Sequence, residues 1–365
     1  MLTEARGQSP RLYAALLVSI LLSFNLSGCG VGYLVQAAHG QWQVLQRRQP
    51  LATVIADPKT AEPVRTQLSV VLDARDFASH SLGLPDNASY RSFAALGRPF
   101  VVWNVVAAPE FSVQPLRWCF PVVGCVAYRG YFKEPAARKF AAQLDRHGDD
   151  VLVAGVTAYS TLGHFADPVL DTMLRYGDVE LAGTIFHELA HQLIYVKGDS
   201  DFNEAFAMSV EQEGVARWLA ARDRGAELDA YIARRNVQDQ VVRLFVAGRS
   251  QLAALYSQPL PLEEHRQRKQ QILAQTGTAV REFEARQGLS SGYDEWIDQG
   301  LNNAHLASVA TYFECVPAFQ RLLAENDGDL PRFYAAVRAL AREPAARRRA
   351  LCASDKSAPP PQASR

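Results

Sequence analysis

The stretch Leu181-Ala-Gly-Thr-Ile-Phe-His-Glu-Leu-Ala-His-Gln-Leu-Ile-Tyr195 places His187 and His191 four residues apart, with Glu188 directly after the first histidine. Residues four apart share one face of an α-helix, so both imidazoles can reach one metal ion. Zinc binds neutral imidazole nitrogens and commonly keeps a water at an open position, where Glu188 could take a proton from it. Because three ionisable groups on an apolar, buried helix are unfavourable unless something neutralises them, we expect one Zn²⁺ ion here.

A second helix downstream supplies the candidate for a third metal ligand. The first helix is expected to end near Gly198, because glycine suits a helix C-terminus, and the next helix begins a few residues later. In the resulting antiparallel hairpin, His191 faces Glu204 and His187 faces Glu211. We therefore expect Glu204 to bind the metal and Glu211 to hold the His187 ring, although the two glutamates could exchange roles.

The segment Asn203-Glu-Ala-Phe-Ala207 resembles the Asn-Glu-Gly-Phe-Ala segment that supplies the third zinc ligand in the aminopeptidase N family, a gluzincin family. More closely, the chain resembles a family of predicted bacterial aminopeptidases, many of them lipoproteins. That resemblance covers most of the mature chain. It rests on the segments Ala127-Tyr-Arg-Gly-Tyr-Phe132, His187-Glu-Leu-Ala-His-Gln192, Leu301-Asn-Asn-Ala304 and Val316-Pro-Ala-Phe319, and on the N-terminal motif described below. One departure is that His191 and Glu204 are closer in sequence than in the better-known gluzincins.

The resemblance implies a zincin-like fold, a peptide substrate and a further catalytic residue. Gluzincins place a Tyr or His donor downstream to stabilise the oxyanion, and Tyr312 is the candidate here. Tyr312 could equally be a core aromatic, because it has helical spacing from Cys315 and Phe319. Asn303 is a candidate for hydrogen bonding to the substrate backbone, whereas His305 is expected at the surface.

The N-terminus has the pattern of a secretory signal. Two arginines precede an apolar run of about fifteen residues from Leu12 to Leu26, which is short for a helix that spans about 30 Å. The run ends in Leu26-Ser-Gly-Cys29, which resembles the lipobox of bacterial lipoproteins. We therefore expect residues 1–28 to be a lipoprotein signal peptide and Cys29 to be lipidated. The resemblance, with Gly30 after the cysteine, favours the periplasmic face of the outer membrane.

The remaining cysteines fit an exported chain. Without Cys29, four cysteines remain, and none has the spacing of a metal site. The favoured pairing joins Cys119 with Cys125 and Cys315 with Cys352, although four free thiols remain an alternative. The proline-rich end of the chain, residues 354–365, is expected to be a disordered tail.

Pattern and composition predict an α+β protein that is mainly helical, with a small β-sheet beside a helical body. β-branched and aromatic residues predict strands near Val101–Val106 and Val123–Phe132, and a third near Val151–Val156. The pattern predicts helix for the whole chain after Asp167, up to the tail. Residues 29–353 contain no evident linker, so we expect one metallopeptidase domain. The 38 basic and 38 acidic side chains balance, which gives no electrostatic indication of nucleic-acid binding.

These features together predict a zinc-dependent aminopeptidase that hydrolyses peptide bonds at free N-termini, with Glu188 activating the zinc-bound water. Cleavage at free N-termini rests on the family resemblance, because no acidic group for the substrate ammonium can be assigned. A zinc endopeptidase and a non-catalytic, zinc-stabilised envelope lipoprotein remain the alternatives. The sequence does not predict the oligomeric state or the preferred side chain.

Overall fold

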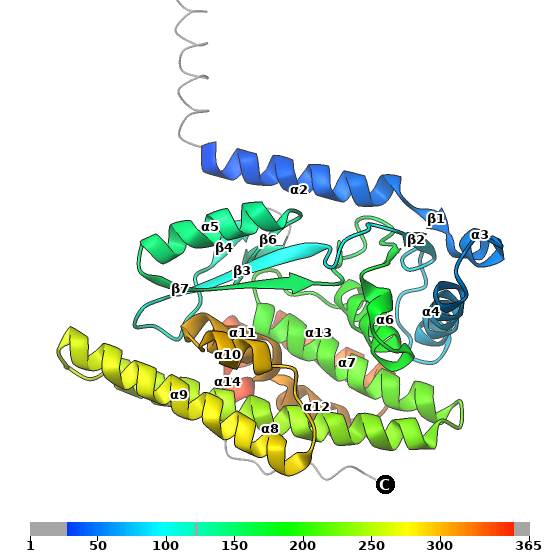
Figure 1. The fold of residues 1–365 in the computed structure, drawn as a ribbon. Coiled ribbons are helices and arrows are strands. Elements are labelled where there is room, and N and C mark those ends of the chain that lie inside the picture. Colours follow the sequence, from blue (N-terminus) through cyan, green and yellow to red (C-terminus); the bar gives the residue numbers. More distant parts are fainter. Residues whose placement is uncertain (1–27, 121–122, 354–365) are drawn as a thin grey trace, which may run out of the picture.

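The computed structural model describes residues 28–120 and 123–353. The apolar run from Leu12 to Leu26 and the tail at 354–365 lie outside the described residues. Within the described residues, no helix is both long enough and apolar enough to cross a membrane. The chain is mainly helical with a small amount of sheet, which confirms the predicted α+β class (Figure 1).

The main sheet has three antiparallel strands in the order β6-β3-β7. Their bounds are Arg129–Tyr131 for β6, Val102–Pro109 for β3 and Asp149–Val156 for β7. Successive side chains point to opposite faces, so Trp103 and Val105 belong to one core cluster and Val106 to another. The first cluster packs under α5 (Glu134–Arg146), and the second packs against α11 (Asn303–Phe313).

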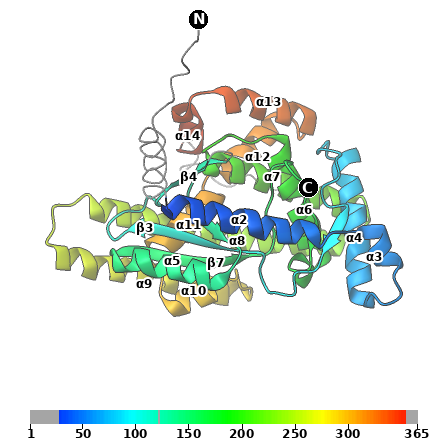
Figure 2. The same cartoon turned by 90° about the horizontal axis from the view of Figure 1, so that it is seen from above.

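The helix α2 (Gly28–Gln46) also lies over the face that α5 covers (Figure 2), and it contacts β6. Short strands form two further sheets: β1 (Gln49–Pro50), β2 (Ser92–Ala94) and β8 (Val169–Leu170) in one, and β4 (Trp118–Phe120) with β5 (Gly124–Val126) in the other. The strand predicted over 123–132 is thus two strands, β5 and β6. Strand β8 falls in the part that was expected to be helical. Strands of two or three residues carry too little sequence pattern to be recognised.

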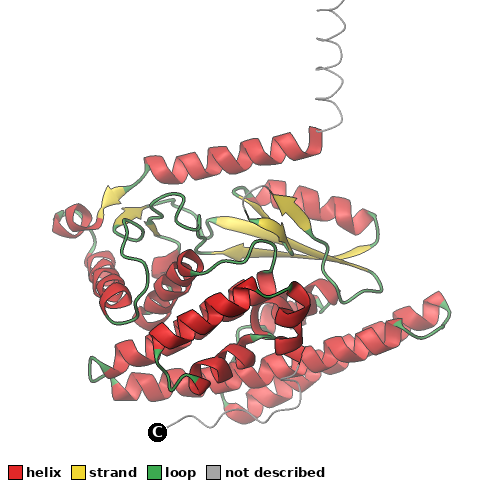
Figure 3. Cartoon of the chain, turned by 180° about the vertical axis from the view of Figure 1, so that it is seen from behind, coloured by secondary structure: helices red, strands yellow, loops and turns green. Residues whose placement is uncertain are grey.

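The helical body surrounds a large apolar core built around α6 (Asp178–Leu193) and α7 (Ser200–Ala220). Beside it, α8 (Gly225–Tyr256) and α9 (Leu262–Gln287) form a long hairpin with a separate core cluster (Figure 3). The remaining helices are α3 (Leu51–Ala56), α4 (Glu62–His80), the 3-10 helix η1 (Met173–Arg175), α10 (Asp294–Gln299), α12 (Val316–Glu325), α13 (Leu330–Arg342) and α14 (Ala345–Ala353).

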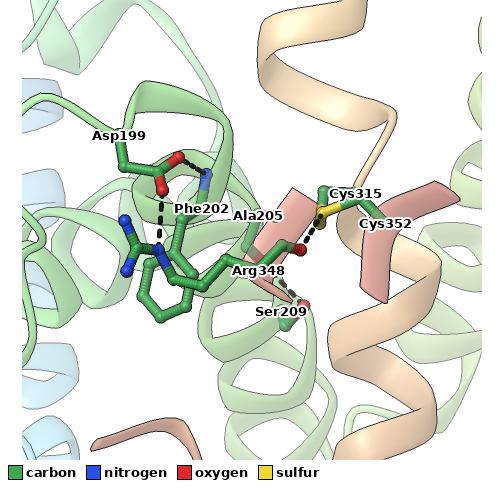
Figure 4. The surroundings of a disulfide bond; sticks show 7 residues. All are labelled: Asp199, Phe202, Ala205, Ser209, Cys315, Arg348 and Cys352. Carbon is green, nitrogen blue, oxygen red and sulfur yellow. Dashed lines mark hydrogen bonds and ion pairs between the residues drawn. A yellow bond between two sulfur atoms is a disulfide. The ribbon is translucent and has the colours of Figure 1, made fainter. Parts of the chain in front are cut away.

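Two disulfides join cysteines in the pairing that the sequence favours. Cys119–Cys125 links the facing strands β4 and β5. Cys315, which precedes α12, is bonded to Cys352 of α14 (Figure 4).

Candidate metal centre

The helices α6 and α7 pack closely along their length. Asp178 and Glu180 lie in the first turn of α6, where negative charge is favourable to a helix. Glycines allow the close approach: a Cβ on Gly214 would lie 2.8 Å from side-chain atoms of Leu82 and Phe186. A Cβ on Gly183 would lie 3.3 Å from the Glu211 side chain. The small residues therefore let polar side chains of the two helices face one another at short range.

The connection between the helices differs from the predicted one. Helix α6 ends at Leu193 rather than near Gly198, because Ile194 adopts an extended conformation. Asn203 then replaces the lost helical partners of Val196: its amide oxygen accepts from the Val196 N–H at 2.7 Å, and its NH₂ donates to the Val196 carbonyl at 2.9 Å. Gly198 has a positive φ of 78° in the turn. Asn203, the residue directly before the proposed ligand Glu204, thus fixes the conformation of this turn.

The β4–β5 hairpin braces this turn from one side. The N–H of Gly198 donates to the Val123 carbonyl at 3.1 Å. Arg117 donates through one guanidinium nitrogen to the carbonyls of both Cys125 and Gly198. The disulfide-linked hairpin therefore holds the backbone between the two helices.

Helix α14 braces the turn from another side (Figure 4). Asp199 caps α7, because its carboxylate accepts from the Phe202 N–H, and the same carboxylate accepts from Arg348 at 2.7 Å. The Arg348 guanidinium also lies 5.8 Å from the centre of the Phe202 ring. Although Arg348 lies in a run of three arginines, its side chain is only 11% exposed.

Three potential metal ligands converge between α6 and α7. The Nε2 atoms of His187 and His191 lie 3.1 Å apart, and Glu204 Oε2 lies 3.4 Å from the first and 3.6 Å from the second. Ligand atoms at about 2.0–2.1 Å from a tetrahedral zinc ion would lie about 3.3–3.4 Å from one another. Two imidazole nitrogens and one carboxylate oxygen also form a common zinc ligand set. The three side chains therefore fit a zinc ion, in the combination expected from the sequence.

Glu211 lies behind His187 rather than beside the other ligand atoms. Its Oε2 is 3.0 Å from His187 Nδ1, so a proton on Nδ1 would be donated to Glu211 and leave Nε2 free to bind metal. In the described residues, His191 Nδ1 is buried and has no hydrogen-bond partner. The ring of His191 is therefore held by packing, while that of His187 is held by a carboxylate.

Burial and charge shift the pKa values of the site in opposite directions. Burial alone would raise the pKa of Glu204, but the two histidines outweigh it and lower the pKa to about 2. Burial would lower the pKa of His187, but hydrogen bonds to Glu204 and Glu211 raise it well above its usual range. Burial raises the pKa of Glu188, and the nearby histidines oppose this effect. Glu204 and Glu211 favour a protonated His187 ring. A metal ion would have to replace that proton in order to bind.

The comparison with known protein families fits this geometry. A family model with the description "Putative aminopeptidase" matches residues 32–352 of the chain. The chain belongs to this family. No curated protein and no solved structure matches it. The match includes both helices of the metal centre and all the elements that brace them, and the family's description implies a peptide substrate.

Two partly buried tyrosines of the aminopeptidase-family chain interact electrostatically with the carboxylates of the metal centre. Tyr312, at the end of α11, was predicted from sequence, whereas Tyr128, between β5 and β6, was not assigned a role. For both, burial and then the charges of Glu204 and Glu188 raise the pKa. Both hydroxyls therefore stay protonated at neutral pH and can donate hydrogen bonds.

Asn303 does not lie where a substrate could reach it. It is fully buried at the start of α11, where its amide oxygen accepts from the Tyr256 hydroxyl at 2.9 Å. Its NH₂ donates to the carbonyls of Pro109 and Glu110. These bonds use its hydrogen-bonding capacity, so Asn303 holds α11 against the end of β3, and the substrate contact finds no support.

His305, which was expected at the surface, is 6% exposed and takes part in the cap of α11 with Asn302. Burial lowers its pKa to about 4. The surface expectation was wrong, because the cap turns the ring inward.

Proposed function

We propose that this chain is a zinc-dependent aminopeptidase that removes residues from the free N-termini of peptides. The family match supports a peptidase. The observation that carries the zinc proposal is the convergence of His187 and His191 Nε2 with Glu204 Oε2, beside the buried Glu188. We further propose that residues 29–353 form one metallopeptidase domain of zincin-like fold.

In the proposed reaction, His187, His191 and Glu204 hold the ion, and Glu211 keeps the His187 ring in its binding tautomer. Zinc, when bound, supplies Lewis acidity to the attacking water and to the carbonyl of the scissile bond. Glu188 accepts the proton of the water and passes it to the leaving amine.

The two tyrosines are the proposed oxyanion donors. Tyr312 and Tyr128 approach the site from α11 and from the β5–β6 connection, and each is electrostatically coupled to Glu204 and Glu188. A phenol that stays protonated can donate to the oxygen on which negative charge develops. We propose that at least one of them does so.

The test uses the purified, zinc-loaded chain and pairs of peptides that differ only by N-terminal acetylation. We expect cleavage of the free peptides alone. Glu188→Gln is expected to lower kcat by about 10²–10⁴-fold while zinc content stays the same, because only the base is lost.

Other outcomes would separate the alternatives. Equal cleavage of free and acetylated peptides would make the protein an endopeptidase. Full activity in Glu188→Gln would exclude Glu188 as the base. A zinc-loaded wild type that cleaves neither peptide, and that is unchanged by the substitution, would favour a non-catalytic, zinc-stabilised envelope protein.

A further inference from the structure

Helix α2 has one face that is bound to the rest of the molecule. Gln36 donates to the Gly130 carbonyl, and Gln41 hydrogen-bonds to the Tyr159 hydroxyl. The Tyr33 ring stacks on Phe120, with ring centres 5.1 Å apart. A Cβ on Gly40 would overlap the Phe132 ring, so only glycine allows this approach. These four residues recur at the spacing of one helical face.

The opposite face of α2 is apolar and exposed. Leu34, Val35 and Trp42 are 49%, 62% and 55% exposed, and Ala38 between them is also exposed. At about 100° per residue, these four side chains fall within one arc of about 100°, which is the width of a typical apolar helix face. In a water-soluble helix such a face normally points inward, whereas here it points away from the protein.

Nothing in the described chain covers this face. Figures 1 and 3 show α2 as an outermost helix, with the sheet and α5 on its inner side. Residues 28–46 contain no Asp, Glu, Lys or Arg. The first charged residues after α2 are Arg47 and Arg48, whose guanidiniums donate to backbone carbonyls of neighbouring loops. The exposed face therefore has no charge with which to recognise a charged protein partner.

The proposed lipid attachment indicates what covers this face. Cys29 lies in the first turn of α2. A chain anchored there by a lipid holds the apolar face near a bilayer surface. We propose that the face formed by Leu34, Val35, Ala38 and Trp42 lies in the interfacial region of a lipid bilayer, with α2 parallel to the membrane.

The chemistry of the face suits this occupant. Tryptophan is enriched at the level of lipid headgroups, where its ring is partly buried and its N–H stays hydrated. Polar His39 and Gln43, which form a hydrogen bond with each other, flank the apolar arc on the side toward the headgroups. Because the arc carries no charge, its binding should depend little on salt or on anionic lipid. A lipid anchor alone leaves the domain free to tumble, whereas this contact fixes its orientation.

The experiment uses the full chain reconstituted into phosphatidylcholine vesicles with and without brominated acyl chains, which quench nearby tryptophans. We expect brominated lipid to quench the emission, and Trp42→Phe to remove most of that quenching. The double variant Leu34→Gln/Val35→Gln should lower Trp42 quenching at least about twofold. Leu262→Gln/Leu289→Gln, which changes two exposed leucines at the ends of α9, is the matched control and should leave it unchanged.

The proposal is overturned if Trp42→Phe leaves the quenching intact, or if the wild type is not quenched at all. It is also overturned if the two double variants have the same effect. If Trp42 escapes quenching and Leu34→Gln/Val35→Gln dissociates a dimer in light scattering, the face is a contact between two copies. None of these results depends on peptidase activity.

Discussion

The hairpins α6–α7 and α8–α9 are both pairs of consecutive helices with short connections (Figure 1), but the side chains between their helices differ. Between α8 and α9, the buried side chains are mainly apolar, as with Val241, Phe245 and Val280. Between α6 and α7, two imidazoles and two carboxylates meet. The same architecture thus serves packing in one hairpin and a polar centre in the other.

The charges of the two hairpins are also neutralised differently. On α9, Arg268 pairs with Glu264 and both are largely exposed, while the buried Lys269 pairs with Asp150 at 2.7 Å. Each of these acids has a cationic partner. In the α6–α7 centre, Glu204 and Glu211 pair with histidines, whose charge depends on a proton that a metal ion can replace. The carboxylates that pair with titratable histidines therefore indicate a candidate site. The carboxylates that pair with lysine or arginine serve a structural role.

The largest expected effect comes from removing one proposed metal ligand from the α6–α7 hairpin. Glu204→Ala should abolish both stoichiometric zinc and peptide hydrolysis, because only two ligands would remain. Glu264→Ala on α9 is the matched control, since its exposed pair is worth at most about 1 kcal/mol. Zinc content by mass spectrometry and hydrolysis rates check both variants. Full zinc in Glu204→Ala would remove Glu204 from the ligand set.

A smaller effect distinguishes a metal ligand from the residue that orients a ligand. Glu211→Ala should lower zinc affinity by about 10–100-fold, because the His187 ring loses the group that orients it. Glu211→Gln should recover part of the affinity, since its amide oxygen can still accept from Nδ1. Competitive zinc titrations measure both variants. If Glu211→Ala lost zinc completely while Glu204→Ala kept it, the two glutamates would have exchanged roles.

The smallest effect concerns stability alone. Arg348→Ala leaves the partly buried Asp199 without its cationic partner. The substitution should lower the free energy of unfolding by about 1–3 kcal/mol, between the values for exposed and buried ion pairs. Arg268→Ala removes an exposed arginine on α9 and should change it by about 0.5 kcal/mol or less. Urea unfolding of the two variants, with both disulfides oxidised, compares them. Equal losses would show that the Arg348–Asp199 pair adds no more stability than an exposed pair.

Local rules account for what could be predicted. The spacing of His187 and His191 places both rings on one helical face whatever the rest of the chain does. The short connection to α7 forces an antiparallel hairpin, so Glu204 and Glu211 could be placed opposite the histidines by counting. The structure contains the favoured disulfide pairing, in which Cys119 and Cys125 face each other across a hairpin.

Long-range contacts account for what could not be predicted. Tyr128 reaches the site from a strand connection 60 residues before Glu188, and Arg348 reaches the turn from 149 residues beyond Asp199. Their partners are distant in sequence, so no local pattern connects them. The burial of Asn303 and His305 likewise depends on the strand β3 and the cap of α11 that surround them.

Helix α2 shows the same division between sequence and tertiary structure. Its apolar residues Leu34, Ala38 and Trp42 recur at four-residue intervals, which is a helical spacing and a local property of the sequence. Which face is buried is not local. The protein binds the face on which Tyr33 stacks on Phe120 and Gly40 lies against Phe132, and the apolar face is left outside. The sequence by itself determined the helix and the metal-ligand spacing; only the tertiary structure decided which surfaces meet.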